Sequence, residues 1–306
     1  MHTPTMVAAA TSVLDLAPAA RLPFDGRRRE WAYWPAPREG VALWALDRAG
    51  AKAVHRLLAT ALALPAFARA VAIESLDEVL GRLEGHRDDR RHRDDYWVAV
   101  FGEPGTEPWG WRFEGHHVSV HATLAGGEVR MTPLFLGANP AVVTDGDRVV
   151  SDPLGPEEAL GFELLHALTT EQRASATIAD EAPRDIVTRN AARLDGPLAP
   201  VGVPLAALAG PAAGAAAALL DVYLGRFPDG APRPDPSDAA FAWAGADRPG
   251  AGHYYRLAGP RLVIELDNTQ DGANHVHTVV RDPAADFGDD VLGDHLRRDH
   301  LSGGGA

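Results

Sequence analysis

The pattern of hydrophobic and polar positions divides the chain into helical and strand-like blocks. Apolar residues recur near the 3.6-residue period of a helix over 7–16, 41–64 and 67–83. Aromatic and β-branched residues then become frequent, as in strands, over 96–101, 109–123 and 129–136. The second half repeats this order, with helical stretches from 156 and over 205–224, then strand-like stretches over 241–245, 253–267 and 275–280. Helices followed by strands, twice, predict an α+β fold.

Two of the strand-like stretches resemble each other and predict an internal duplication. Residues 109–121 align without a gap on residues 253–265, with matching aromatic, arginine and glycine positions. The offset is constant, since 256 minus 112 and 265 minus 121 both equal 144. We therefore expect two similar α+β halves, 1–150 and 151–306, in one compact unit. Their antiparallel or mixed sheets should meet at a shared cleft.

The composition allows a large core and argues against several classes of protein. Of 306 residues, 46% are hydrophobic, and the net charge of −13 does not suit a nucleic-acid or anionic-membrane partner. The chain has no cysteine, which excludes disulfides, thiolate nucleophiles and cysteine-ligated zinc. No apolar run reaches the roughly 18 residues of a transmembrane helix, and residues 1–20 lack the basic start of a signal peptide. We therefore expect a soluble, cytoplasmic protein.

Alternation along the strands predicts where polar side chains gather, because side chains two residues apart share a face. In the stretches 117–123, 261–267 and 275–277, apolar residues alternate with histidines or carboxylates. The apolar set should face the core and the polar set should face the other way. If the polar faces converge, they surround one space with His117, His121, Glu265, Asp267, His275 and His277.

Histidines combined with a carboxylate predict a divalent metal site. Imidazole and carboxylate groups are ligands that Zn²⁺, Mn²⁺ and Fe²⁺ accept. His275 and His277 can supply two adjacent ligands from one strand, and His117 and Glu265 can supply the others. The competing interpretation is that these histidines are hydrogen-bonded residues of the sheet, in a metal-free pocket or in a purely structural role.

Other side chains near these strands are candidates for catalysis and for the walls of a substrate pocket. Glu265 and Asp267 are a candidate acid–base pair, and Arg112 is a candidate clamp for a substrate carboxylate. For Arg112, an ion pair with Glu114 or Glu265 is the competing role. The candidate wall residues are Trp109, His116, His121, Tyr254, Arg256, Asn268 and Asn274. Aromatic residues at such positions often belong to the core instead.

Several familiar reaction types lack their motifs in this chain. No Gly-x-Ser-x-Gly nucleophile elbow occurs, which argues against a serine hydrolase of that kind. No Gly-x-Gly-x-x-Gly follows a strand and no Gly-Lys-Ser/Thr phosphate loop is present, so a nucleotide cofactor is not expected. The turn at 137–140, Gly-Ala-Asn-Pro, is interpreted as structural.

Four longer motifs carry a resemblance to a known family. They are Trp109–His117, Thr132–Pro140, Glu265–Gln270 and Ala273–His277. With them, the chain resembles DUF3500, a bacterial and fungal family of unknown function, from about Val7 to about Phe287. The family usually has Leu-Asn where this chain has Val120-His121. The resemblance implies no reaction.

The sequence therefore indicates where a functional site lies better than it indicates which reaction takes place there. The leading hypothesis is a metal-dependent enzyme that acts on a small anionic molecule in a cleft lined by histidines and carboxylates. The alternative is a non-catalytic protein that binds a small molecule in the same cleft. A closed apolar pocket capped by Trp109 and Tyr254 would favour this binder. A structural or interaction protein is the third hypothesis.

Overall fold

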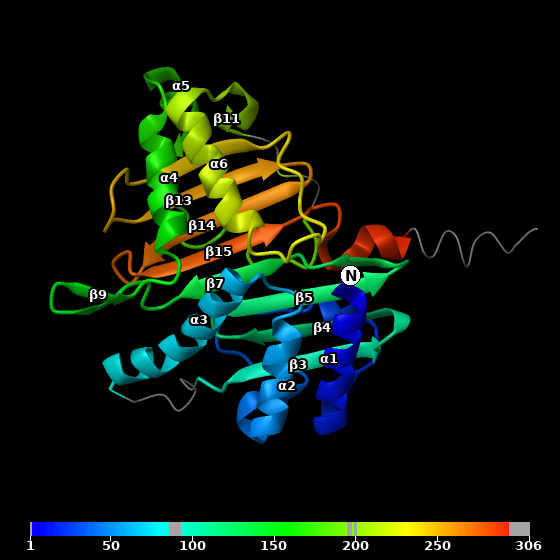
Figure 1. The fold of residues 1–306 in the computed structure, drawn as a ribbon. Coiled ribbons are helices and arrows are strands. Elements are labelled where there is room, and N and C mark those ends of the chain that lie inside the picture. Colours follow the sequence, from blue (N-terminus) through cyan, green and yellow to red (C-terminus); the bar gives the residue numbers. More distant parts are fainter. Residues whose placement is uncertain (1, 86–92, 195–197, 199–200, 294–306) are drawn as a thin grey trace, which may run out of the picture.

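One large mixed sheet organises the protein (Figure 1). The computed structural model describes residues 2–85, 93–194, 198 and 201–293. The 13 strands of the sheet are β1 (Arg21–Leu22), β2 (Val41–Ala42), β3 (Tyr96–Glu103), β4 (Thr106–Gly115), β5 (Val118–Ala125), β6 (Glu128–Arg130), β7 (Leu134–Ala138), β10 (Thr177–Ala179), β11 (Val203–Pro204), β12 (Ala240–Gly245), β13 (His253–Gly259), β14 (Leu262–Gln270) and β15 (His275–Arg281). A separate hairpin of β8 (Val143–Asp145) and β9 (Arg148–Ser151) projects from the body (Figure 1).

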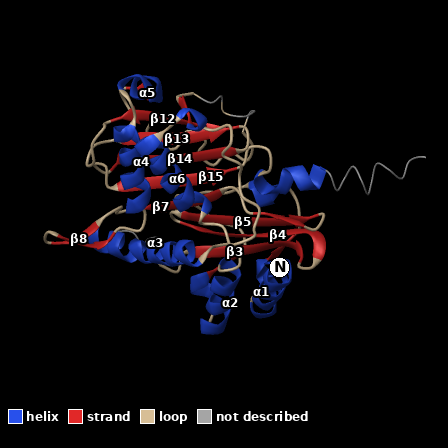
Figure 2. Ribbon diagram, turned by 45° about the horizontal axis from the view of Figure 1, so that its top comes forward, coloured by secondary structure: helices blue, strands red, loops and turns tan. Residues whose placement is uncertain are grey.

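Helices cover one face of the sheet (Figure 1 and Figure 2). The α-helices are α1 (His2–Leu16), α2 (Arg48–Leu58), α3 (Leu64–Leu83), α4 (Gly155–Ala167), α5 (Thr170–Ala176) and α6 (Gly210–Leu224). The 3-10 helices are η1 (Pro18–Ala20), η2 (Gly26–Arg29), η3 (Leu43–Ala45), η4 (Leu205–Ala207) and η5 (Asp286–Gly288). The α+β prediction is confirmed.

The main core lies between these helices and the sheet. It contains Val118, Val120, Ala122 and Leu124 of β5 and Leu262, Ile264 and Leu266 of β14, together with buried apolar residues of the helices. Burial of apolar surface is the dominant stabilising term in such a layer. The strand alternation read from the sequence therefore identified the core-facing residues of both strands correctly.

Irregular segments cover the opposite face of the sheet. A small apolar cluster holds them there, and it consists of Trp31, Tyr33, Phe135, Ile186, Val279 and Phe287. Phe135 and Val279 belong to β7 and β15, and their neighbours Leu134 and Val280 lie in the helical core. Because strand side chains alternate, this cluster lies on the other face. The strand faces that were predicted to be polar are therefore covered by a layer of loops.

Some predicted elements have different bounds in the structure. The stretch 41–64, expected to be one helix, begins with β2 and η3, and α2 starts only at Arg48. Asp47 caps α2 by accepting from the N–H of Gly50, and Pro65 stands in the first turn of α3. The stretch 109–123 forms two strands, joined by a turn at His116 and His117.

The strands of the two halves follow one another in corresponding order from either edge of the sheet to its centre. From one edge it runs β1-β3-β4-β5-β7 and from the other β10-β12-β13-β14-β15, and β7 pairs with β15 at the centre. Both edge strands are parallel to their neighbours, while β2 and β11 add antiparallel pairs to β3 and β12. Across β4 and β5, Arg112 pairs with His121, and across β13 and β14, Arg256 pairs with Glu265.

In the described part of the chain, no helix combines the length and apolar character needed to cross a membrane. The longest of them, α3, has 20 residues, but it carries charged side chains, among which Glu74 and Asp77 are buried.

Two glycines at corresponding places provide a test of the fold. Gly40 and Gly202 precede β2 and β11, with φ of 105° and 113°, and an added Cβ would lie 2.1 Å from Val98 O and 2.0 Å from Phe241 O. We expect Gly40→Ala and Gly202→Ala each to lower the free energy of unfolding by about 2 kcal/mol or more, through backbone strain and overpacking. Chemical denaturation monitored by circular dichroism measures this effect.

Gly146 is the matched control for these two substitutions. It also has positive φ, 59°, but nothing lies within 4 Å of the position of its Cβ. Gly146→Ala should therefore cost only about 1 kcal/mol, the price of the left-handed backbone alone. Equal losses in all three variants would show that the close approach to the neighbouring strands does not matter.

Candidate metal centre

Three histidines from two distant segments converge on the loop-covered face of the sheet. His117 Nε2 lies 2.8 Å from His275 Nε2 and 3.2 Å from His277 Nε2. Their ligand atoms all lie within 4.8 Å of one another. All three belong to the four metal ligands predicted from the sequence, so the structure assembles three-quarters of that set.

The backbone around His117 fixes the first of these side chains. His117 is the second residue of the turn between β4 and β5, and its φ of 68° is uncommon for a residue other than glycine. Its N–H donates to Tyr33 O at 3.0 Å, and its C=O accepts from the N–H of Gly137 at 2.7 Å. A strained backbone held by its surroundings in this way is typical of functional sites.

Gly137 provides the space in which the imidazoles meet. It lies in β7, opposite His277 of β15. An added Cβ at this position would lie 2.9 Å from His117 Cδ2 and 3.1 Å from His277 Cδ2. A glycine inside a central strand often marks such a close approach, so the absence of a side chain here is a requirement of the site.

Carboxylates orient two of the three rings. His275 Nδ1 lies 2.8 Å from Asp271 Oδ2, and His277 Nδ1 lies 2.8 Å from Asp185 Oδ1. A carboxylate only accepts when it is ionised, so both Nδ1 atoms carry the hydrogen, and in the neutral form of each ring the Nε2 atom presents a lone pair. Histidines that bind metals are commonly oriented by a carboxylate in this way.

Electrostatics favours the neutral, metal-binding form of His275 and the ionised form of Asp185. Burial, together with the nearby His277, lowers the pKa of His275 to about 4. Burial opposes ionisation of Asp185, but hydrogen bonds from His277 and Tyr33 outweigh it and lower the pKa of that carboxyl group. A metal ion needs deprotonated imidazole nitrogens, and near neutral pH His275 is already in this neutral form.

Two of the three nitrogen separations are comparable with those between ligands of a divalent ion. Nitrogen ligands at the ~2.0–2.1 Å of a Zn–N bond are about 3.3 Å apart in tetrahedral geometry. The two Nε2 separations from His117, 2.8 and 3.2 Å, are shorter than this value, and all three ligand atoms lie within 4.8 Å of one another. When His275 and His277 are neutral, at most one hydrogen on His117 Nε2 can point to one of the two facing lone pairs, so the other contact lacks a hydrogen. A cation at the meeting point would satisfy all three nitrogens.

A cavity of about 260 Å³ opens beside the histidines. It is lined by Tyr33, Trp34, Pro35, His116, His117, Asn139, Asp185, Gln270, His275 and His277. His116, a predicted wall residue, stacks on His117 with ring centroids 3.8 Å apart. Its Nδ1 lies 2.5 Å from Asp77 Oδ1, which places a further oriented imidazole at this cavity.

Glu265, the fourth predicted ligand, lies elsewhere. It is fully buried, and its carboxylate accepts from the N–H groups of Val187 and Thr188, from the hydroxyl of Thr188 and from Tyr254 Oη. The described residues that converge as a metal-binding group do not include it. Its position on the polar face was predicted correctly, but the sequence did not show that residues 187–188 occupy the carboxylate.

The other two predicted catalytic residues also lie outside the lining of the cavity. Arg112 is buried, donates to Glu30 O, and has its Nε 3.1 Å from Glu114 Oε1. This is the ion pair that the sequence offered as its competing role. Asp267 pairs with His277 across β14 and β15, and its Oδ1 accepts from Thr269 Oγ1 at 2.8 Å. Burial raises the pKa of Asp267 to about 7.

Most predicted wall residues have structural contacts instead. Trp109 belongs to the helical core, and Tyr254 donates to Glu265. Arg256 pairs with Glu265 across the sheet and does not line the histidine cavity.

The two predicted asparagines support the backbone near the site. Asn268 Oδ1 accepts from the N–H of His275 at 3.1 Å, and Asn274 Oδ1 accepts from the N–H of Val142 at 2.8 Å. His121, also predicted at the wall, is buried between Trp31 and Phe287, with its Nε2 2.9 Å from Ser119 Oγ.

Several site residues were missed by sequence reasoning. Asp185 and Tyr33 lie in irregular segments where no periodicity marks a face, and Tyr33 Oη donates to Asp185 Oδ2 at 2.8 Å. Asn139 Nδ2 lies 3.1 Å from Asp271 Oδ2 and 3.2 Å from His275 Nδ1. The turn at 137–140, interpreted from the sequence as structural, thus also contributes Asn139 to the lining of the cavity.

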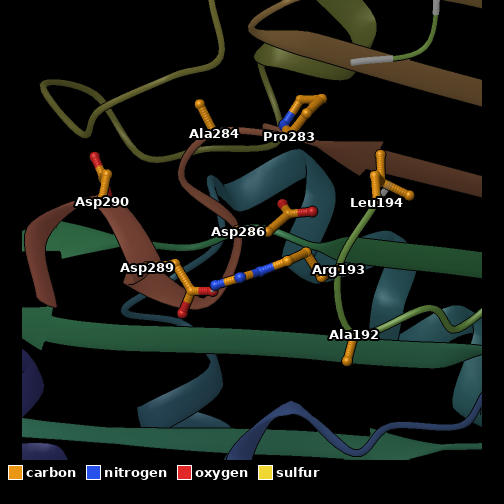
Figure 3. A pocket seen from close by; sticks show the side chains of 8 residues that line it. All are labelled: Ala192, Arg193, Leu194, Pro283, Ala284, Asp286, Asp289 and Asp290. Carbon is orange, nitrogen blue, oxygen red and sulfur yellow. The ribbon is translucent and has the colours of Figure 1, made fainter. Parts of the chain in front are cut away.

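A second cavity, of about 310 Å³, lies beside η5 and is shown in Figure 3. It is lined by Ala192, Arg193, Leu194, Pro283, Ala284, Asp286, Asp289 and Asp290. Its charges already have partners, since Arg193 extends to Asp289 at 2.7 Å (Figure 3) and Asp286 accepts from Arg281. These ion pairs help to hold the loop layer against the sheet.

Comparison with known proteins identifies the family. A family model described as "Protein of unknown function (DUF3500)" matches residues 2–289, so the chain belongs to this family. No curated protein and no solved structure matches the chain.

His121 gives a pH-dependent stability that can be measured. Burial and the charges of Arg112, Arg281 and Arg28 lower its pKa well below 6.5. The unfolded chain takes up this proton below about pH 6.5, so stability is full above that pH and is lost as the pH falls. We expect His121→Asn to reduce the slope of unfolding free energy against pH, between pH 6.5 and 5, by up to about 1.4 kcal/mol per unit.

Urea denaturation across this pH range measures the slope. Ser119→Ala is the control, because it removes the hydroxyl 2.9 Å from His121 Nε2 but keeps the imidazole. Its slope should stay close to that of the wild type. An unchanged slope in His121→Asn would mean that this ring does not stay neutral in the folded protein.

Proposed function

From its membership of a family of unknown function and from the geometry of the site, we propose that this protein is a metal-dependent enzyme. Its centre is a divalent ion held by His117, His275 and His277, and its substrate is a small anionic molecule admitted to the adjoining cavity. The observation that carries the proposal is the convergence of three Nε2 atoms, two of them on rings oriented by carboxylates.

The three imidazole ligands limit which ions can bind and which chemistry a bound ion can supply. Three imidazoles without a thiolate suit Zn²⁺, Mn²⁺ or Fe²⁺. An ion with three protein ligands keeps a position for water or substrate, where it polarises a carbonyl or lowers the pKa of the water. The cavity beside the histidines supplies the room for that position. Asp185 and Asp271 hold the rings, and His116, oriented by Asp77, lies at the same cavity.

The non-catalytic binder has less support. Its distinguishing feature was a closed apolar pocket capped by Trp109 and Tyr254, and both have other roles, in the core and as a donor to Glu265. The cavity found instead is lined mainly by polar side chains.

We also infer that the two halves, 1–150 and 151–306, descend from one duplicated unit. The palindromic strand order and the matched pairs Arg112–His121 and Arg256–Glu265 support this inference. The histidine site then combines a turn of the first half with a strand of the second. Experimental coordinates in which the best superposition of the halves failed to pair Arg112 with Arg256 would contradict the duplication.

Metal binding is the direct test of the proposed function. We expect the purified protein to bind about one equivalent of Zn²⁺, Mn²⁺ or Fe²⁺ and to lose it to a chelator. Metal should raise the melting temperature, because the unfolded chain lacks the assembled site. Alanine at His117, His275 or His277 should abolish binding and the response to chelator. Native mass spectrometry, elemental analysis and thermal denaturation measure these effects.

His166→Ala is the matched control, since it removes a histidine of α4 that is bonded to Asp247 O and lies outside the cavity. It should retain wild-type stoichiometry. If the wild type binds none of the three ions and its melting temperature does not respond to them, the proposed function is wrong.

Asp185 should tune the affinity of the site without being a ligand. Asp185→Asn keeps the shape but weakens the acceptor that fixes the Nδ1 hydrogen of His277. We expect the dissociation constant for Zn²⁺ to rise about 10- to 100-fold with the stoichiometry unchanged. Competition with a chromophoric chelator measures it. Tyr33→Phe, which removes only the hydroxyl that donates to Asp185, should have a smaller effect. Equal affinity in wild type and Asp185→Asn would exclude this positioning role.

A further inference from the structure

The charges around the histidine cavity restrict what it can bind. Among the described residues that line it, none is an arginine or a lysine, and Asp185 is a carboxylate. A ligand with two or more negative charges therefore finds no cationic side chain here.

The ion itself does not change this conclusion. Two carboxylates, Asp185 and Asp271, lie against the rings that would hold it and offset part of its positive charge. Sites for phosphate groups or dicarboxylates usually offer arginine as a bidentate partner, and this cavity offers amides instead, from Asn139 and Gln270.

The size of the cavity fits a single ring with small substituents. A cavity of about 150 Å³ is enough for benzene, and this one has about 260 Å³. One wall is formed by the consecutive residues Tyr33, Trp34 and Pro35. Tyr33 is held by stacking on Phe135, with centroids 4.3 Å apart, and Trp34 meets it edge-on at 5.1 Å. Trp34 is 44% exposed, so part of its ring is open to a molecule in the cavity.

We infer that the ligand of this cavity is a single-ring molecule that chelates the metal through oxygen and carries at most one negative charge. The inference rests on the proposed metal centre and narrows its small anionic substrate. Three protein ligands leave positions on the ion for the oxygen atoms of a chelating group. The aromatic wall takes the ring, and a lining whose described residues include neither arginine nor lysine disfavours a second anionic group.

The test uses three probes and the Co²⁺-loaded full-length protein, whose visible spectrum reports ligand binding. Benzohydroxamate has one ring and a single anionic chelating group, acetohydroxamate lacks the ring, and 4-carboxybenzohydroxamate keeps the ring and the chelating group but adds a second negative charge. We expect benzohydroxamate to bind about tenfold more tightly than acetohydroxamate, from contacts with the aromatic wall. It should exceed 4-carboxybenzohydroxamate by at least about tenfold, because the second charge has no partner.

Two tryptophan variants separate the ring contact from general effects. Trp34→Ala should reduce the preference for benzohydroxamate several-fold and leave acetohydroxamate unchanged. Trp44→Ala is the matched control, because Trp44 is 60% exposed and does not line the cavity. It should behave as the wild type does.

The possible failures are distinguishable. If the protein binds no Co²⁺ and no Zn²⁺, the metal centre itself is wrong. If it binds metal with the expected stoichiometry but binds 4-carboxybenzohydroxamate as tightly as benzohydroxamate or more tightly, the proposed limit of one negative charge is wrong and the metal centre stands. If acetohydroxamate binds as tightly as benzohydroxamate, or Trp34→Ala changes nothing, the aromatic wall does not select a ring.

Discussion

The pairing of β7 with β15 is the contact on which both the fold and the site depend. It joins strands from the two halves into one sheet, and it sets His277 opposite Gly137. The same glycine donates its N–H to His117 O, so one residue fixes the turn that carries the first histidine and leaves room for the ring of another. A shift of register by one residue would turn His277 to the helical face. The histidine site can therefore form only when β7 and β15 pair in this register.

The loop layer is held to the sheet largely by buried charges that bind backbone groups. Glu265 accepts from the N–H groups of Val187 and Thr188, and this fixes the segment that also carries Asp185. Ile186, between these residues, is fully buried in the small apolar cluster. A charge buried without partners would be costly, and here hydrogen bonds offset that cost. Glu265 thus acts on the histidine site from a distance, by placing Asp185 against His277.

The sequence predicted what depends on local periodicity and missed what depends on the path of irregular chain. Alternation identified the core-facing residues of β5 and β14 and placed His275 and His277 on one face. It could not show which segment would cover Glu265, so a carboxylate with four donors was mistaken for a metal ligand. Asp185 and Tyr33 come from segments without periodicity, and only tertiary contacts reveal them. The charge of the side chains that line the cavity could not be predicted either, because Asp185 comes from one of these irregular segments.

Proton positions, more than residue types, favour the proposed metal ion. Three nearby histidines alone can form an ordinary hydrogen-bonded cluster. Here the Nδ1 hydrogens of His275 and His277 already point to Asp271 and Asp185, so in the neutral form of both rings both Nε2 atoms direct lone pairs at the same Nε2 of His117. With one hydrogen there at most, one of the two contacts then sets lone pair against lone pair. The left-handed backbone of His117 adds strain at the same point. A cation bound between the three nitrogens would remove this repulsion, and it would meet two rings that the carboxylates already orient.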